Sequence, residues 1–449
     1  MTAKRAAIIL AAGQGTRMKS KTVKVLHAVG GRPMLDWVVD LSAQVGAEKT
    51  VTVWGAHSPA VRVAAEAAGT LTALQDPPQG TGHAVQAAQA ALEGFQGHAV
   101  ILYADTPLIR EQTLERVFEA LDAGASVAVL GFEPSDPAAY GRLITNAAGG
   151  LDRIVEAKDA SREELAVGLV NSGVLAAPAP LLFDLLSEVT NENANGEYYL
   201  TDVVGLARAR GLDAAVVVAP SDEVLGVNSR LDLAAAEAAF QSRKREEMMA
   251  AGVTLQDPQS VHFAWDTSIE RDVVIEPHVV FGPGVTIAED ARIRAFSHLE
   301  GARVGSGAVV GPYARLRPAA EIGEGAKIGN FVEVKKAQIG PGAKVNHLSY
   351  VGDADIGASA NLGAGTITCN YDGFDKYRTV VGEGAFIGSN TALVAPVTVG
   401  AGAFTGSGGV ITRDVPADAL ALARAEQSNK EGWAERFRTV KTARKSKKD

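Results

Sequence analysis

The sequence predicts two folds in one chain: an α/β domain with a mostly parallel sheet, followed by an all-β parallel β-helix. Residues 1–229 alternate apolar runs with helical patterns, which is typical of an α/β unit. Residues 230–252 are rich in helix formers. From Ile275 to Ile411 an aliphatic residue returns at about every sixth position, a period that fits neither a helix nor an alternating strand.

This six-residue period is that of a hexapeptide β-helix, in which three hexads make one triangular coil. Aliphatic side chains then stack inside, and glycine or other small residues take the tight corners. The inward positions are Ile275, Phe281, Ile287, Ile293, Leu299, Val304, Val310, Leu316, Ile322, Ile328, Val334, Ile339, Val345, Val351, Ile356, Leu362, Val381, Ile387, Leu393 and Val399. A Gly-rich sandwich is the alternative, but sandwich strands do not keep phase over so many repeats.

Length and composition restrict the class of protein. A chain of 449 residues is expected to form two or more domains. A net charge of −9 argues against a general nucleic-acid partner. The single cysteine, Cys369, has no partner for an intrachain disulfide, which favours a reducing cytoplasm. The N-terminal residues show no long apolar region of a signal peptide, and no apolar run is long enough to span a membrane.

The first half should contain strands and helices in alternation. The expected strands are 6–12, 49–55, 98–105 and 125–132, and the expected helices are 34–46, 58–69 and 111–124. Ser58 and Pro59 suit the N-cap and first turn of their helix. Ligands of such a fold bind at the carboxyl ends of the parallel strands.

Two later segments mark transitions. Ser229 and Asp232 read as the capped start of a long helix that ends at Gly252 and joins the domains, although it could also belong to the first domain's surface. The hexapeptide array breaks between Thr368 and Val380. An insertion rich in polar and aromatic residues does not help to stack coils, so we expect this loop to carry function.

The first strand ends in a glycine-containing loop, LAAGQGTRM, from Leu10 to Met18. Gly13 and Gly15 permit close backbone approach to a phosphate, and Arg17 and Lys24 add positive charge. The loop lacks the third glycine of the Rossmann fingerprint and the GK[ST] of a Walker loop. By itself it reads equally well as a plain turn.

The wider string LAAGQGTRMKSKTVKVLHAVGGRPML resembles the opening of sugar-nucleotide pyrophosphorylases. The segments QDPPQGTGHA, YADTPLI, YGRL, IVEAKDA, NSGV and LGVNSR follow in the order of that family. Together with the hexapeptide array, about residues 5–433 resemble the family of bifunctional N-acetylglucosamine-1-phosphate uridyltransferases/glucosamine-1-phosphate acetyltransferases. The resemblance implies a Rossmann-like nucleotidyltransferase domain (1–229), a helical linker (230–252), a left-handed β-helix acetyltransferase domain (253–424) and a C-terminal tail (425–449).

For the first site the resemblance implies that a sugar-1-phosphate attacks the α-phosphorus of UTP. Asp105 and Asn228 would hold Mg²⁺. Without the resemblance, Asp105 could equally be a residue that caps a helix or a turn. Gln75, Gly80 and Thr81 match residues that read uracil, and the same GTGHA segment suits a helix start. The implied nucleotide and sugar-phosphate residues are Leu10, Ala11, Ala12, Gly13, Arg17, Lys24, Gln75, Gly80, Thr81, Tyr103, Gly141, Glu156, Asn171 and Asn228; of these, Gly141, Glu156 and Asn171 match contacts to the N-acetylglucosamine moiety. Ala104 departs from the glycine that relatives often carry.

For the second site the resemblance implies acetyl transfer from acetyl-CoA to glucosamine-1-phosphate. An amine nucleophile needs a base, and His347 matches the catalytic histidine; without the resemblance it reads as a surface residue. The implied sugar-phosphate residues are Arg317, Lys335, Tyr350 and Asn361, with Glu333 as an electrostatic aid. The implied acetyl-CoA residues are Ala364, Asn370, Tyr371, Ser389, Ser407 and Arg424; some relatives have alanine in place of Ser407.

The resemblance also implies a cytoplasmic homotrimer that uses small-molecule substrates and makes UDP-N-acetylglucosamine, a cell-wall precursor. Nucleic acid and membrane are not expected as partners. One alternative is another sugar-1-phosphate nucleotidyltransferase with a regulatory β-helix, and a second is a β-helix that serves only as a trimerisation scaffold. Beyond Phe437 the basic sequence predicts a disordered end.

Overall fold

The computed structural model describes residues 3–137, 140–147, 149–193 and 195–445. The chain forms two compact units, Met1–Glu247 with Phe263–Trp265, and Met248–His262 with Asp266–Asp449. The long helix α8 (Arg230–Ala250) therefore belongs mostly to the first unit. Within the described residues, no helix has the length and apolar character needed to cross a membrane.

The first unit is built on a mixed, mostly parallel sheet with the strand order β11-β7-β10-β6-β1-β4-β5. The strands are β1 (Arg5–Leu10), β4 (Ala47–Gly55), β5 (Leu71–Gln75), β6 (His98–Tyr103), β7 (Val127–Phe132), β10 (Val170–Pro178) and β11 (Ala214–Val218). β1 pairs in parallel with β4 and β6, and β7 pairs in parallel with β11. The expected strands of the first half are thus confirmed within a few residues.

Two features of this sheet were not expected from the sequence. β10 runs antiparallel to both β6 and β7. A hairpin of β8 (Arg142–Thr145) and β9 (Leu151–Val155) extends from β10. The segment that contains Glu156 and Asn171 is therefore folded back toward the strand ends of the central sheet.

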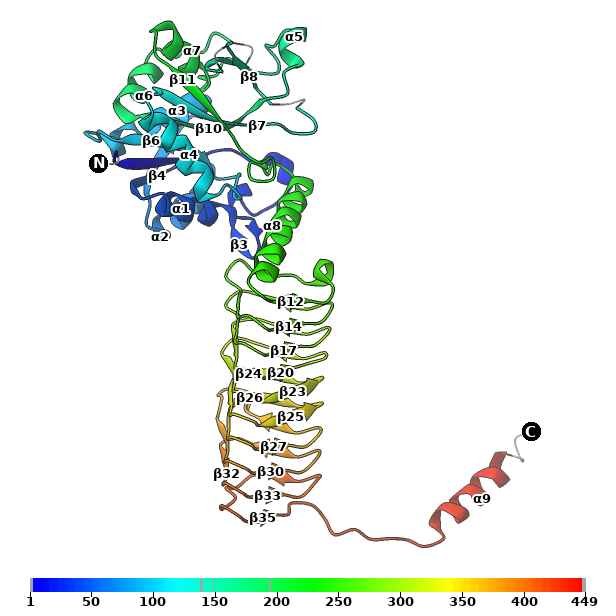
Figure 1. Cartoon of the computed structure of the whole chain (residues 1–449). Helices are drawn as coiled ribbons and strands as arrows, with labels where there is room; N and C mark the ends of the chain where they lie inside the picture. Colours follow the sequence, from blue (N-terminus) through cyan, green and yellow to red (C-terminus); the bar gives the residue numbers. More distant parts are fainter. Residues whose placement is uncertain (1–2, 138–139, 148, 194, 446–449) are drawn as a thin grey trace. The chain divides into compact units, whose positions relative to one another are not determined.

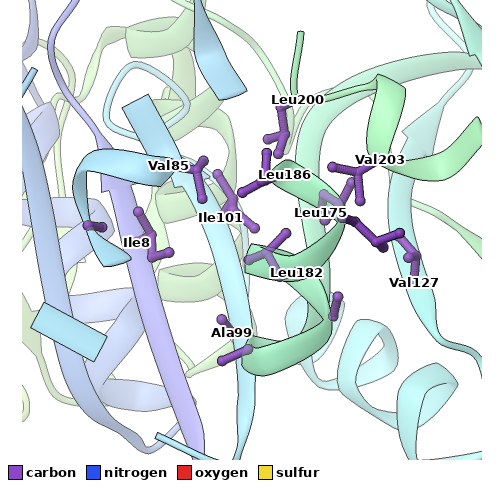
Figure 2. Close-up of a cluster of buried hydrophobic side chains, with 14 of the residues drawn as sticks. Ile8, Val85, Ala99, Ile101, Val127, Leu175, Leu182, Leu186, Leu200 and Val203 are labelled. Carbon is purple, nitrogen blue, oxygen red and sulfur yellow. The ribbon is translucent and has the colours of Figure 1, made fainter. Parts of the chain in front are cut away.

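Helices cover both faces of the sheet because its central strands are apolar on both sides. Ile8 belongs to one buried cluster and Ile9 to the other, as the alternation along β1 requires. Figure 2 shows the first cluster, to which Ile101, Leu182 and Val203 contribute buried side chains. The helices are α1 (Met34–Gln44), α2 (Pro59–Ala67), α3 (Thr81–Ala87), α4 (Glu111–Asp122), α5 (Arg162–Leu165), α6 (Ala179–Leu186) and α7 (Asp202–Ala209).

The three helices expected between the early strands are confirmed as α1, α2 and α4. Ser58 stands at the N-cap of α2 and Pro59 in its first turn, but the Ser58 side chain makes no capping hydrogen bond. α8 begins as expected, because Ser229 N donates to Asp232 Oδ2 at 2.8 Å and Asp232 N donates to Ser229 Oγ at 3.3 Å.

The second unit is a parallel β-helix, so the hexapeptide interpretation is confirmed and the sandwich alternative is wrong. Figure 1 shows the strands of one ladder stacked rung upon rung. This ladder contains β12 (Thr254–Leu255), β14 (Val274–Ile275), β17 (Arg292–Ile293), β20 (Val309–Val310), β23 (Lys327–Asn330), β25 (Lys344–His347), β27 (Asn361–Leu362), β30 (Phe386–Ile387), β33 (Phe404–Thr405) and β35 (Leu420–Ala421).

Two further ladders complete the coil, and β24 (Glu333–Ile339) and β26 (Tyr350–Ile356) take part in both. The second ladder adds β15 (Val280–Phe281), β18 (His298–Leu299), β21 (Arg315–Leu316), β28 (Ile367–Cys369), β31 (Ala392–Val394) and β34 (Val410–Ile411). The third adds β13 (Ser268–Ile269), β16 (Thr286–Ile287), β19 (Ala302–Val304), β22 (Ala320–Ile322), β29 (Thr379–Val381) and β32 (Val397–Val399).

Register explains the sequence period. Ile275 pairs with Ile293, Ile293 with Val310, and Val310 with Ile328, so each inward side chain stacks on the equivalent one of the next rung. Glycines at the corners allow this close stacking. At Gly357 an added Cβ would lie 2.5 Å from the backbone nitrogen of Glu383.

The tail differs from its expected state. Residues up to Lys445 form a helix, α9 (Trp433–Lys445), so the prediction of disorder beyond Phe437 is wrong for the described part. The alanine, arginine and lysine residues of this segment have high helix propensity, which the prediction underweighted. None of the described residues of α9 is buried, and residues 446–449 lie outside the described chain.

Candidate functional sites

A pocket of ≈ 540 Å³ opens at the carboxyl ends of β1, β5 and β6. Its lining includes most of the residues expected at the first site, namely Leu10, Ala11, Ala12, Gly13, Arg17, Lys24, Gln75, Gly80, Thr81, Tyr103, Asp105 and Asn228. A Cβ at Gly13 would meet no protein atom within 4 Å, whereas one at Gly15 would lie 2.6 Å from Lys24 Cβ. Gly15 thus lets the loop pack on Lys24, and Gly13 leaves its backbone open toward a ligand.

Lys24 connects the two residues expected to hold a metal. Its Nζ forms an ion pair with Asp105 Oδ2 and donates to Asn228 Oδ1 at 3.1 Å. Lys24 and Asp105 are largely buried, with side-chain exposures of 10% and 18%. The departure at Ala104 is accommodated, because its methyl group lies in the buried core.

Backbone contacts hold Asp105 and Asn228 close together. Val227 N donates to Asp105 O at 2.9 Å, which ties the start of the LGVNSR segment to the end of β6. Asp232 Oδ2 then accepts from the backbone nitrogen of Asn228 at 3.0 Å and from that of Ser229 at 2.8 Å. The first turn of α8 therefore fixes the backbone of Asn228.

The residues expected to read uracil lie where α3 begins. Gln75, at the end of β5, is buried, and its Nε2 donates to Gly80 O at 2.9 Å. Gly80 has φ 107°, and a Cβ there would lie 2.6 Å from Tyr198 O. α3 starts at Thr81, so both interpretations of GTGHA, helix start and pocket lining, hold.

The residues expected to contact the N-acetylglucosamine moiety form a second group, which does not line the pocket itself. Asn171 N donates to Gly141 O at 2.8 Å. A Cβ at Gly141 would lie 3.4 Å from Glu156 Oε2. Burial raises the pKa of the Glu156 carboxyl, with the charges of Asp159 and Asp202 adding to the effect and Thr201 opposing it. Such a carboxyl is suited to a sugar hydroxyl or an amide N–H.

Tyr103 links this group to the pocket. It lines the pocket, and a Cβ at Gly173 would lie 2.7 Å from its ring. Burial, and secondarily the charges of Asp105 and Glu156, raise the pKa of Tyr103 far above its ordinary value. Tyr103 is therefore a neutral hydroxyl between the candidate metal ligands and the candidate sugar ligands.

The donor set at Asp105 and Asn228 fits Mg²⁺. This ion binds protein through one or two oxygen ligands and completes its shell with water and substrate phosphates. Among the described residues no group of three or more His, Cys, Asp or Glu side chains could hold a metal. One carboxylate and one amide oxygen beside the glycine-containing loop Leu10–Met18 are consistent with an ion that arrives together with a phosphate-bearing ligand.

In the second unit, His347 is the last residue of β25 and is exposed. Its Nδ1 lies 2.9 Å from Asn330 Oδ1, and the two residues are register partners on neighbouring rungs. Because an amide oxygen only accepts, this contact favours a proton on Nδ1 and leaves Nε2 free to take one. His347 also lines a small pocket of ≈ 300 Å³ with Arg294 and Lys327.

A cationic group lies on the adjacent ladder. Arg317 Nη1 donates to Glu333 Oε1 at 2.8 Å. Glu333 on β24 is the register partner of Tyr350 on β26, one rung further along the coil. The close approach of the Lys376 ammonium, with a smaller contribution from Arg317, lowers the pKa of the exposed Lys335 amine. Like charges this close favour an anion between them, as a sugar phosphate would be.

Lys376 was not expected from the sequence. It belongs to the insertion between β28 and β29, which folds back so that Tyr371 and Lys376 form an isolated bridge. Because the sequence predicts a functional role for this insertion, its lysine was a possible candidate for a phosphate-binding residue. Asn330 was also missed, although it precedes His347 by one coil.

The residues expected to bind acetyl-CoA follow the corner beyond His347. Ala364, Ser389 and Ser407 come two positions after the inward residues of β27, β30 and β33. Asn370 is buried, with Nδ2 2.5 Å from Asp353 Oδ2, whereas Tyr371 is exposed. Asn361 lies on β27, and Arg424 follows β35 at the end of the coil.

Comparison with known proteins defines the class as a nucleotidyltransferase domain joined to a hexapeptide-repeat transferase domain. The family described as "MobA-like NTP transferase domain" matches residues 7–165. The family described as "Bacterial transferase hexapeptide (six repeats)" matches residues 266–301 and 301–336. These spans fall in the two units separately.

Full-length relatives are more specific. The "Bifunctional protein GlmU" of Maricaulis maris is 73% identical over 449 residues, covering 100% of this chain and 99% of the relative. Those of Hyphomonas neptunium and Caulobacter vibrioides are 56% and 57% identical, each covering at least 98% of this chain and 96% of the relative. The chain belongs to the family of bifunctional GlmU proteins.

Proposed function

We propose that the two units catalyse consecutive reactions of UDP-N-acetylglucosamine synthesis. The second unit acetylates glucosamine-1-phosphate with acetyl-CoA. The first unit then transfers UMP from UTP to N-acetylglucosamine-1-phosphate and releases pyrophosphate. The full-length match to bifunctional GlmU proteins is the observation that carries this function, and it speaks against a β-helix that only regulates or trimerises.

For acetyl transfer, we assign proton removal to Nε2 of His347. The 2-amino group of the sugar attacks the thioester carbon, the C–S bond breaks, and the amine proton passes to the imidazole as CoA thiolate leaves. Arg317, Lys335 and Lys376 bind the phosphate, while Tyr350 and Asn361 contact the sugar. The contact of Nδ1 with Asn330 supports this role, because it holds the ring in the basic tautomer. Acetyl-CoA lies along Ala364, Asn370, Tyr371, Ser389, Ser407 and Arg424.

For uridylyl transfer, we assign the phosphate loop, Arg17 and Lys24 to the triphosphate. The sugar phosphate oxygen attacks the α-phosphorus while the bond to pyrophosphate breaks, and cationic groups neutralise the charge. Lys24 changes partners, from Asp105 and Asn228 to the nucleotide. Asp105 and Asn228 would hold Mg²⁺, which neutralises phosphate charge when bound. Gly141, Glu156 and Asn171 contact the N-acetylglucosamine moiety, and Gln75, Gly80 and Thr81 read uracil.

The assembly and location are part of the proposal. We infer a homotrimer from the resemblance to bifunctional GlmU proteins, and the repeated flat faces of a β-helix are compatible with a closed three-fold ring. A single free cysteine suits a reducing cytoplasm. We propose functional domains at 1–229, 253–424 and a tail at 425–449, with residues 230–252 as a helical connector; α8 forms most of this connector, and its residues up to Glu247 belong to the first compact unit.

The test is separability of the two activities in the purified full chain. His347→Ala should reduce acetyl transfer by about 10²- to 10⁴-fold, because a general base contributes that much, and should leave uridylyl transfer intact. Asp105→Asn should do the reverse. CoA thiol release and pyrophosphate release measure the two reactions independently. Full acetyl transfer by His347→Ala would refute the assignment of the base, and loss of both activities in either variant would refute the division between units.

A further inference from the structure

The ammonium group of Lys24 contacts both residues to which the proposed function assigns Mg²⁺. Its Nζ forms an ion pair with Asp105 Oδ2 and donates to Asn228 Oδ1 at 3.1 Å. These are the kinds of oxygen atom that a magnesium ion takes as ligands. A lysine ammonium has three donors and no acceptor, so it can serve both oxygens at once. In this structure Lys24 thus provides the positive charge at the candidate metal site.

The contact with Lys24 also determines how one of these ligands is turned. Backbone contacts fix where the two side chains start, because Val227 N donates to Asp105 O at 2.9 Å and Asn228 N donates to Asp232 Oδ2 at 3.0 Å. They do not fix the amide of Asn228. An ammonium group bonds to the oxygen of an amide and not to its nitrogen. Lys24 therefore keeps toward the site the atom that a metal ion requires.

Only the outer part of the Lys24 side chain is free to move. Its Cβ packs against Gly15, where an added Cβ would lie 2.6 Å from it. Beyond this atom the lysine stem is flexible. The same pocket is lined by Lys24, Asp105 and Asn228 and by the loop residues Gly13 to Arg17. Rotation of the stem therefore carries the ammonium toward a phosphate group at this loop without a backbone movement.

We propose that Lys24 is a placeholder for the metal ion: it holds Asp105 and Asn228 in place and keeps free divalent ions out until a nucleoside triphosphate binds. An ion bound to both oxygens would lie close to the ammonium, and the two positive charges repel each other. The side chains of Lys24 and Asp105 are 10% and 18% exposed, so solvent screens this repulsion little. The phosphates of a nucleotide remove the conflict, because they attract the ammonium and bring further oxygen ligands for the ion.

The inference deepens the proposed uridylyl transfer and rests on its assignment of Asp105 and Asn228 to Mg²⁺. It adds that binding of the ion and binding of the nucleotide are coupled through one side chain. Because such coupling is reciprocal, the contact that excludes the ion also holds the ammonium back from the nucleotide. Asp105 therefore opposes metal-free nucleotide twice, through its own charge and through its hold on Lys24.

The first test measures binding of Mn²⁺ alone to the nucleotide-free full chain, from the electron paramagnetic resonance signal of the free ion. Lys24→Met keeps an unbranched apolar stem and removes the charge. Lys21→Met is the matched control, because Lys21 is exposed and lies outside the pocket lining. We expect Lys24→Met to bind Mn²⁺ about tenfold or more tightly than the wild type, whereas Lys21→Met should bind it as the wild type does.

The double variant Lys24→Met/Asp105→Asn shows where the ion binds. It should lose the gain in Mn²⁺ affinity, because the carboxylate ligand is gone. Binding by Lys24→Met no tighter than by the wild type would overturn the placeholder role and leave the metal assignment standing. A gain that persists in the double variant would refute the metal assignment, and the inference with it. Circular dichroism checks the fold of each variant, and Lys24→Ala takes the place of Lys24→Met if the latter does not fold.

The second test measures binding of UTP in excess EDTA by calorimetry. Asp105→Asn loosens the hold on Lys24, so it should bind metal-free UTP about tenfold or more tightly than the wild type. Glu197→Gln is the matched control: Glu197 also lines the pocket, but Lys24 is bonded to Asp105 instead. This control should show a smaller gain, because it removes the same charge without releasing Lys24. Equal gains in the two variants would overturn the coupling through Lys24.

Discussion

At the scale of single residues, the chemistry depends on which protonation state each side chain is held in. Asn330 faces His347 Nδ1 at 2.9 Å and thereby selects the tautomer with a basic Nε2. At the other site, burial keeps Tyr103 neutral and raises the pKa of Glu156. Both the contact of Asn330 with His347 and the burial of Tyr103 and Glu156 depend on residues from other rungs or strands. They could therefore not be predicted from the neighbouring sequence.

Asn330→Ala should lower the acetyl-transfer rate roughly tenfold, less than loss of the base itself, because the ring remains but is no longer oriented. Asn330→Asp keeps the acceptor and adds a negative charge, which raises the pKa of an adjacent histidine. The acidic limb of the pH–rate profile should therefore move to higher pH in Asn330→Asp. An unchanged rate in Asn330→Ala, together with an unchanged profile in Asn330→Asp, would show that Asn330 does not act on His347.

Glu156 allows a pH test of stability. Its folded pKa lies above the unfolded value of about 4.3, so the folded state holds the proton more tightly. This contribution is fully present below about pH 4.3 and is lost as the pH rises through the folded value. Glu156→Gln removes this titration. The difference in free energy of unfolding, variant minus wild type, should therefore increase from about pH 4.5, near the unfolded pKa of a glutamate, to about pH 7.5, well above it.

Urea unfolding followed by tryptophan fluorescence measures this difference, because Trp37, Trp54 and Trp265 all lie in the first unit. The same variant should show a raised KM for N-acetylglucosamine-1-phosphate. A stability difference that is constant with pH would contradict the burial of an ionisable Glu156.

At the scale of elements, helix and loop ends position the reacting groups. The first turn of α8 holds Asn228 through the carboxylate of Asp232, which accepts from two consecutive backbone nitrogens. The insertion after β28 brings Lys376 to Lys335. The helix cap was predictable from the spacing of Ser229 and Asp232, but its connection to the pocket required the contact of Val227 with Asp105.

Asp232→Ala should weaken apparent Mg²⁺ activation of uridylyl transfer about two- to thirtyfold, since losing an N-terminal capping interaction costs on the order of 0.5–2 kcal/mol. Asp232→Asn retains an acceptor oxygen and serves as the matched control with a smaller loss. Titration of initial rate against Mg²⁺ at saturating UTP measures the effect. Identical Mg²⁺ dependence in Asp232→Ala and wild type would exclude a positioning role.

At the scale of the whole molecule, the six-residue period predicted the fold of the second unit more completely than local propensity predicted the sheet of the first unit. The stacking of Ile275 on Ile293 follows directly from the six-residue period, since a coil of three hexads returns after about eighteen residues. The antiparallel strand β10 and the β8–β9 hairpin were missed, because strand direction depends on pairing between distant segments. The pocket was predictable from its loop, whereas the group around Glu156 was placed by that missed hairpin.

The central claim is that one chain holds two independent active sites that share a released intermediate. The most direct measurement supplies glucosamine-1-phosphate, acetyl-CoA, UTP and Mg²⁺ to His347→Ala, to Asp105→Asn and to a mixture of the two purified variants, and follows UDP-N-acetylglucosamine. Two independent sites predict almost no product from either variant alone and steady formation in the mixture after a lag, as N-acetylglucosamine-1-phosphate accumulates. A mixture as inactive as its components, although each variant keeps its own partial reaction, would contradict the claim.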